Sequence, residues 1–124
     1  MKLEHGDLTT QIIGAAIDVH RELGPGFLES IYERALVIGM QEKGLFVQQQ
    51  MELPVYYNNI EVGRHRLDLF VEKTIVIGLK AIKELADIHF ATVRSYLKAA
   101  GKKHELLLNF NRMPLEIKRV LYEP

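Results

Sequence analysis

The chain has 124 residues, of which 48% are hydrophobic and 26% are charged, and this balance predicts one globular domain over residues 1–124 rather than a disordered segment. Sixteen lysines and arginines offset sixteen aspartates and glutamates, so any affinity for nucleic acid must come from a local patch of charge. The absence of cysteine excludes a disulfide framework and a thiolate metal site, and it favours a reducing, cytoplasmic setting.

Two amphipathic helices are predicted at the start of the chain. Apolar residues recur at helical spacing from Leu8 to Leu23, and Gly24-Pro25-Gly26 then breaks the pattern. A second amphipathic run begins at Leu28 and ends near Lys43-Gly44. No apolar stretch reaches the length of a signal peptide or a membrane span, so we expect neither secretion nor membrane insertion.

From Leu45 the apolar period changes to two, which predicts a half-buried strand as far as Tyr57. Pro54 favours an interruption or an edge position within that strand. Asn58-Asn59 predicts a tight turn, because asparagine tolerates positive φ, and a partner strand follows from Ile60.

The next hairpin has a register that its apolar residues specify. If Val71 pairs with Ile75 across a three-residue loop, one face of the hairpin is apolar throughout. Opposed residues share a face, so Asp68 lies across from Gly78. Arg66 lies across from Lys80. The register therefore predicts one polar neighbourhood formed by these four residues.

One more helix and two strands complete the predicted elements. A helix over 87–100 has an apolar stripe and ends at Gly101. Residues 105–110 predict a short buried strand that is apolar on both faces, as a central strand is. A last strand is expected around 117–121.

The order of these elements is close to the αβββαβ core of restriction-endonuclease-like nucleases, with an extra N-terminal helix and a mixed central sheet, so we expect an α/β fold of that kind. Gly26, Glu29 and Tyr32 match a GxxExxY signature. Further blocks follow in the family's order: Leu67-Asp68-Leu69, Ile77-Gly78-Leu79-Lys80-Ala81, Ser95-Tyr96-Leu97-Lys98 and Leu108-Asn109-Phe110. The chain thus resembles the GxxExxY family of the PD-(D/E)xK nuclease superfamily over nearly its whole length.

The resemblance implies a metal-dependent phosphodiester hydrolase, with Asp68 as the motif aspartate, Lys80 as the motif lysine and Glu29 as the helix carboxylate. Glu29 and Asp68 would then be ligands of Mg²⁺ or Mn²⁺, because hard cations prefer oxygen. The lysine ammonium would offset charge that develops on phosphorus. Three further residues are candidates for substrate binding: Tyr32, Arg66 and Tyr96.

Each of these residues also fits a structural role. Glu29 is consistent with an ordinary glutamate at the boundary of a helix. Asp68 and Lys80 are consistent with a structural ion pair, and Tyr32 with a core aromatic. His89 lies on one edge of the third helix with Thr92 and Tyr96, where a structural histidine is more common than a general base.

Two positions depart from the family pattern. Glutamate is expected where Gly78 stands, and glutamine where Thr92 stands. A site without the glutamate predicts impaired or absent catalysis and weak or absent metal binding. Glu72, Glu84 and Glu29 are the carboxylates considered as substitutes, and Gly78→Glu is expected to be tolerated and to restore metal binding.

Other functions compete with the nuclease. A non-catalytic module would bind nucleic acid or a protein partner through a basic surface formed by Arg64, Arg66, Lys80, Lys83, Arg94 and Lys98. An exposed strand edge would instead pair with a second copy of the chain, giving a homo-oligomer. Salt-dependent DNA binding distinguishes the first of these from the second.

Overall fold

The computed structural model describes residues 5–123, and this part of the chain has three helices and five strands. The elements in chain order are α1 (Gly6–Leu23), α2 (Glu29–Glu42), β1 (Val47–Tyr57), β2 (Ile60–Val71), β3 (Ile75–Lys80), α3 (Asp87–Ala100), β4 (His104–Asn109) and β5 (Glu116–Leu121). Every predicted element is present, and the predicted bounds of α3 are those observed. None of the described helices is long and apolar enough to cross a membrane.

The strands form one sheet in the order β1-β2-β3-β4-β5. β3 and β4 are parallel and are connected through α3, whereas the other neighbouring pairs are antiparallel. A parallel pair needs a crossover connection, and α3 supplies it. The result is the expected α/β fold with a mixed sheet, compatible with a restriction-endonuclease-like core.

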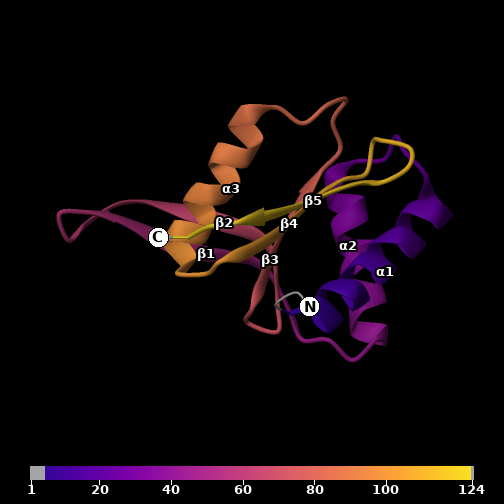
Figure 1. Cartoon of the computed structure of the whole chain (residues 1–124), viewed down its shortest axis with the longest axis horizontal. Helices are drawn as coiled ribbons and strands as arrows, with labels where there is room; N and C mark the ends of the chain where they lie inside the picture. Colours follow the sequence, from indigo (N-terminus) through magenta and orange to yellow (C-terminus); the bar gives the residue numbers. More distant parts are fainter. Residues whose placement is uncertain (1–4, 124) are drawn as a thin grey trace.

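Helices cover both faces of the sheet. Figure 1 shows α1 and α2 on one side and α3 on the other. The α1/α2 side buries alternate strand residues such as Leu69, Ile77 and Leu106. The α3 side buries their neighbours, including Phe70, Val76 and Leu107, against Val93 and Leu97 of the helix. In β3 and β4 the buried side chains alternate strictly between the two clusters, so these clusters tell which face the remaining residues of those two strands occupy.

β1 and β2 form a long hairpin whose tip projects beyond the rest of the molecule (Figure 1). Asn58 and Asn59 make its turn with φ of 49° and 63°, which confirms the predicted positive-φ turn. The strand does not break at Pro54, which pairs with Arg64. The shift in register lies just beyond it, between Val55 and Tyr56. β1 is an edge strand of the sheet, which confirms the edge position that Pro54 favours.

β2 and β3 are paired over a short distance only. Val71 lies opposite Ile75 and Leu69 lies opposite Ile77, which confirms the predicted register. The paired residues end there. Arg66 instead pairs with Glu52 of β1, so the expected placement of Arg66 across from Lys80 is not found. Beyond Leu69 the two strands are no longer paired residue by residue, and the point where the pairing ends is called the fork between β2 and β3.

Candidate functional site

Asp68 lies where the ladder between β2 and β3 stops. Its Oδ2 atom accepts a hydrogen bond from the backbone N–H of Leu79 at 2.8 Å. The carboxylate therefore serves as the acceptor for the Leu79 N–H, in place of the backbone carbonyl that continued β2/β3 pairing would provide. Burial raises the pKa of Asp68, while the Leu79 N–H and the Lys80 ammonium lower it. The side chain is half-buried, so it is anchored and still reachable.

Glu29 and Lys80 are close enough to Asp68 for their charges to interact. Glu29 is the first residue of α2 and Lys80 the last residue of β3. Desolvation raises the pKa of Glu29; Lys80 lowers it, and Asp68 and Glu33 raise it further. Glu33 is held by Gln50, whose Nε2 donates to Glu33 Oε1 at 2.7 Å. The structure therefore brings together the two carboxylates and the lysine that the sequence indicated.

A third carboxyl group, absent from the sequence-based candidates, belongs to Glu105 of β4. Glu105 is only 1% exposed, and neither of its oxygens has a hydrogen-bond partner among the described residues. Burial and, to a smaller extent, the charge of Asp68 raise its pKa to about 8, against the lowering effect of Lys80. An unpaired buried carboxyl group is costly, so its presence beside Asp68 and Lys80 requires an explanation.

Gly78 explains how Glu105 fits. A Cβ atom at Gly78 would lie 2.7 Å from Glu105 Oε2 and 3.2 Å from Leu107 Cδ1. Glu105 and Gly78 face α3, because each is two residues from a member of the apolar cluster on that side, Leu107 and Val76 respectively. The Glu105 carboxyl group therefore occupies the space that a side chain at position 78 would fill. The expected tolerance of Gly78→Glu stays a prediction, and it requires the Glu105 carboxyl group to move out of that space.

Tyr96 of α3 lies against the same group of acids. Burial raises its pKa, and the charges of Asp68 and Glu105 add to that rise. Its ring meets that of His65 edge-on, with centroids 4.4 Å apart. The phenol is half-buried beside the carboxylates, which keeps Tyr96 as a candidate for substrate contact.

Tyr32 is placed differently. Its side chain is 0% exposed, and its ring stacks on Phe110 at 4.6 Å between centroids. The hydroxyl donates to the carbonyl of Gly24 and accepts the N–H of Phe27. A side chain with no exposed surface does not reach substrate in this conformation, so Tyr32 holds the loop between α1 and α2 and thereby the start of α2.

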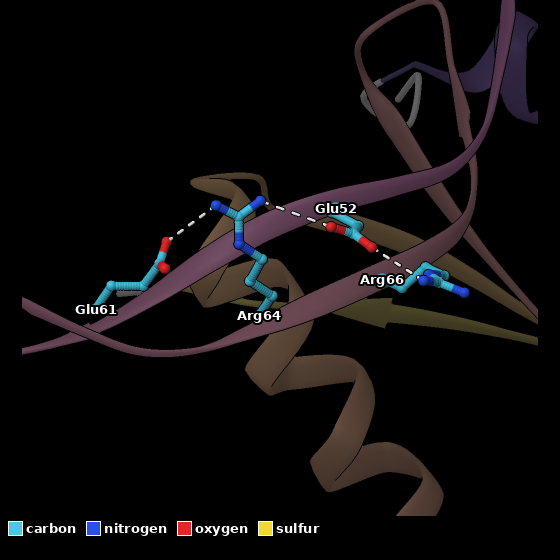
Figure 2. A network of polar contacts seen from close by, with 4 residues as sticks. All are labelled: Glu52, Glu61, Arg64 and Arg66. Carbon is cyan, nitrogen blue, oxygen red and sulfur yellow. Dashed lines mark hydrogen bonds and ion pairs between the residues drawn. The ribbon is translucent and has the colours of Figure 1, made fainter.

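Arg66 belongs to a surface network on the β1/β2 hairpin, which Figure 2 shows. Its Nη2 donates to Glu52 Oε1 at 2.9 Å, and Arg64 bridges Glu52 at 3.6 Å and Glu61 at 3.4 Å. These side chains are exposed, and the Arg66 interaction lowers the pKa of Glu52. Two members of the expected basic surface thus have acidic neighbours.

His89 and Thr92 use their polar atoms locally. His89 Nδ1 accepts the N–H of Ala86 at 2.8 Å, which caps the start of α3. The Thr92 hydroxyl donates to the carbonyl of Ile88 at 2.9 Å. Of the carboxylates considered as substitutes for position 78, Glu72 accepts the N–H of Phe46 at 2.6 Å and lies at the turn between β2 and β3, and Glu84 is exposed.

A hard divalent cation suits the chemistry of this site. Asp68 and Glu29 offer carboxylate oxygens, and Glu105 adds two that lack partners. Within residues 5–123, no three histidine, cysteine, aspartate or glutamate side chains are arranged to hold a metal ion by themselves. Mg²⁺ retains several waters and often takes only one or two carboxylates plus phosphate oxygens, so this donor set fits it.

One feature of the sequence singles out Glu105 as a candidate site residue. It opens a strand that is otherwise apolar on both faces, and glutamate is almost never fully buried unless it is paired. What the sequence lacks is the alignment of β4 with β3. That parallel register places Glu105 beside Val76 and Leu107 beside Gly78. The two strands are separated by α3, so no hairpin turn sets their alignment.

A family model described as the PD-(D/E)XK nuclease superfamily matches residues 6–120, which is nearly the whole chain. The match spans every helix and all the site residues described above. A comparison with curated proteins gives no match. A comparison with solved structures gives none either.

Proposed function

Because the chain belongs to the PD-(D/E)XK nuclease superfamily, we propose that it hydrolyses phosphodiester bonds of nucleic acid with the help of Mg²⁺ or Mn²⁺. The observation that supports this proposal is the grouping of Asp68, Glu29 and Lys80 at the fork between β2 and β3. Within the superfamily, Gly26, Glu29 and Tyr32 support an assignment to the GxxExxY group.

Each residue has a distinct role in this proposal. Asp68 and Glu29 would hold the cation, and the Leu79 N–H keeps the Asp68 carboxylate in one orientation. Lys80 lies beside these carboxylates, where its ammonium would offset negative charge on a reacting phosphate. A bound divalent ion supplies Lewis-acid polarisation and lowers the pKa of water. Tyr96 would contact the nucleic acid at the α3 side of the site.

The expectation of impaired catalysis applies to a site whose only carboxylates are Glu29 and Asp68. We propose instead an active domain, because Glu105 gives the site another carboxyl group at the position of the missing side chain. The lack of cysteine agrees with a cytoplasmic setting, which we also propose.

The test is cleavage of labelled plasmid, single-stranded DNA and RNA with Mg²⁺, with Mn²⁺ and with EDTA. We expect metal-dependent products from the parent chain and a loss of at least about a hundredfold in Asp68→Asn, as for an interaction made in the transition state. Glu61→Gln, on the distant hairpin network, is the matched control and should cleave like the parent. Absence of cleavage of all three substrates by folded protein would contradict the proposal.

The alternative is a non-catalytic module that binds nucleic acid or protein. It predicts binding without cleavage, with a steep dependence on salt if phosphates are contacted. The pairing of Arg64 and Arg66 with Glu52 weakens the basic surface on which it depends. Self-association through a strand edge predicts instead a concentration-dependent mass that is insensitive to nucleic acid.

A further inference from the structure

The carboxyl group of Glu105 and the missing side chain of Gly78 occupy one space. A Cβ atom at Gly78 would approach Glu105 Oε2 to 2.7 Å. That distance is shorter than van der Waals contact, so Glu105 in its present position is compatible with glycine and with no larger residue at 78. Glycine at position 78 thus has two effects. It leaves β3 without the glutamate of the family pattern, and it makes room for the Glu105 carboxyl group from β4.

The two acids meet at the same peptide of β3. Asp68 Oδ2 accepts the N–H of Leu79, and Glu105 Oε2 lies against the preceding residue, Gly78. Asp68 comes from β2 on one side of this strand and Glu105 from β4 on the other. Their charges interact with each other and with Lys80. Two carboxyl groups and an ammonium group are thus gathered around one strand residue.

A structural role does not account for Glu105. A buried glutamate that stabilises a fold is normally paired with a cation or accepts hydrogen bonds. Both Glu105 oxygens lack a hydrogen-bond partner in the described part of the chain, although the residue is 99% buried. No hydrogen-bond donor within residues 5–123 contacts these oxygens, whereas a cation at the site would.

The length of the side chain fits this position. Glu105 lies beside Val76 in the parallel register, one pleat repeat before Gly78, which is roughly 6.6 Å along the strand. Its carboxyl group has to extend along β3 to reach Gly78, and the contact with the Gly78 position shows that it does. Aspartate, shorter by one methylene, would fall short.

We infer that Glu105 supplies, from β4, the second acidic ligand that the family pattern places at position 78 on β3, so that Glu105 takes the place of Glu29 beside Asp68 as the second carboxylate that holds the divalent cation. This inference rests on the proposed function, which gives the site its cation. It goes further by assigning the ligand to a residue outside the linear motif. It also replaces the expectation that metal binding is weak or absent.

The first experiment measures Mn²⁺ affinity by calorimetry and by the electron paramagnetic resonance of free Mn²⁺. We expect the parent chain to bind Mn²⁺, and Glu105→Gln and Glu105→Asp to weaken binding at least about tenfold, as loss of metal-site groups typically does. Asp68→Asn should weaken it similarly. Glu72→Gln, at a rival carboxylate committed to Phe46, is the matched control and should leave affinity unchanged.

The second experiment exchanges the two residues. Glu105→Gly should lose Mn²⁺ affinity, and the double variant Gly78→Glu with Glu105→Gly should recover most of it, because the carboxylate returns to the same space from the other strand. Far-UV circular dichroism without metal checks that each variant folds. If Glu105→Gly does not fold, Glu105→Gln still decides the question, because glutamine keeps the shape of glutamate.

The outcomes separate this inference from the proposed function. If Glu105→Gln and Glu105→Asp bind Mn²⁺ like the parent while Asp68→Asn does not, the role of Glu105 is refuted and the proposed function stands. If the folded parent neither binds Mn²⁺ nor cleaves nucleic acid, both are refuted. If Glu72→Gln alone loses affinity, the second ligand is Glu72 and not Glu105.

Discussion

The stability of the folded chain should decline as pH rises, and Glu105 should be the main cause. Its pKa lies at about 8 in the fold, against 4.5 as an ordinary glutamate. The folded state therefore keeps a proton that the unfolded chain releases, and stability is fully present below pH 4.5 and is lost as pH rises through about 8. At 1.36 kcal/mol per pH unit, the free energy of unfolding should fall by roughly 5 kcal/mol across this window.

That amount is comparable to the whole stability of many domains, which is about 5–15 kcal/mol. Glu105→Gln keeps the shape of the side chain and removes the titration, so it should match the parent near pH 5 and be more stable above pH 8. The groups that face Glu105 are Asp68, Lys80 and Tyr96, and they remain in both proteins. The difference between the two pH profiles therefore isolates residue 105.

Urea unfolding in EDTA at pH 5, 7 and 9 measures this difference. With an m-value of about 1.5 kcal/mol/M, a change of 5 kcal/mol shifts the midpoint by roughly 3 M. Glu84→Gln, at an exposed carboxylate, is the control and should follow the parent at each pH. Parallel profiles for the parent and Glu105→Gln would refute the claim that Glu105 is buried in its protonated form.

Gly78→Ala should destabilise the chain by about 1–3 kcal/mol in urea unfolding, because the added methyl group meets the Glu105 carboxyl group. The same change in a Glu105→Gly background should cost much less, and an equal cost in both backgrounds would contradict the proposed contact. Tyr32→Phe should lower the free energy of unfolding by about 1–3 kcal/mol, because it leaves the Phe27 N–H and the Gly24 carbonyl without their partner. It should leave the KM for cleavage nearly unchanged, and a raised KM at full stability would instead assign Tyr32 to substrate binding.

The sequence predicts the local elements of this fold well, because short-range patterns determine them. The helical stripe and Gly101 bound α3, and the paired asparagines mark the β1/β2 turn. The β2/β3 register follows from a three-residue loop together with an apolar face, and both are visible in the sequence. Such features depend on residues that are close together along the chain.

The candidate site is predictable only in part, because its geometry depends on long-range alignment. The family motif identifies Glu29, Asp68 and Lys80, and the structure brings their charges together. Arg66 is not across from Lys80 because the pairing of β2 with β3 ends at Leu69, while β2 stays paired with β1, where Arg66 meets Glu52. Glu105 is missed because a crossover helix separates β4 from β3, and turn chemistry does not set their relative alignment.

The shared space between Gly78 and Glu105 also constrains the evolutionary history of the chain. Two residues that compete for one space are epistatic, so the acceptable residue at either position depends on the other. Glutamate at both positions crowds the strands, and glycine at both leaves the site without the acid. A change at one of the two positions is therefore best accommodated together with a change at the other. Searches for linear motifs would count a chain with the acid on β4 as having lost its site, and searches that compare the positions of carboxylates in space would retain it.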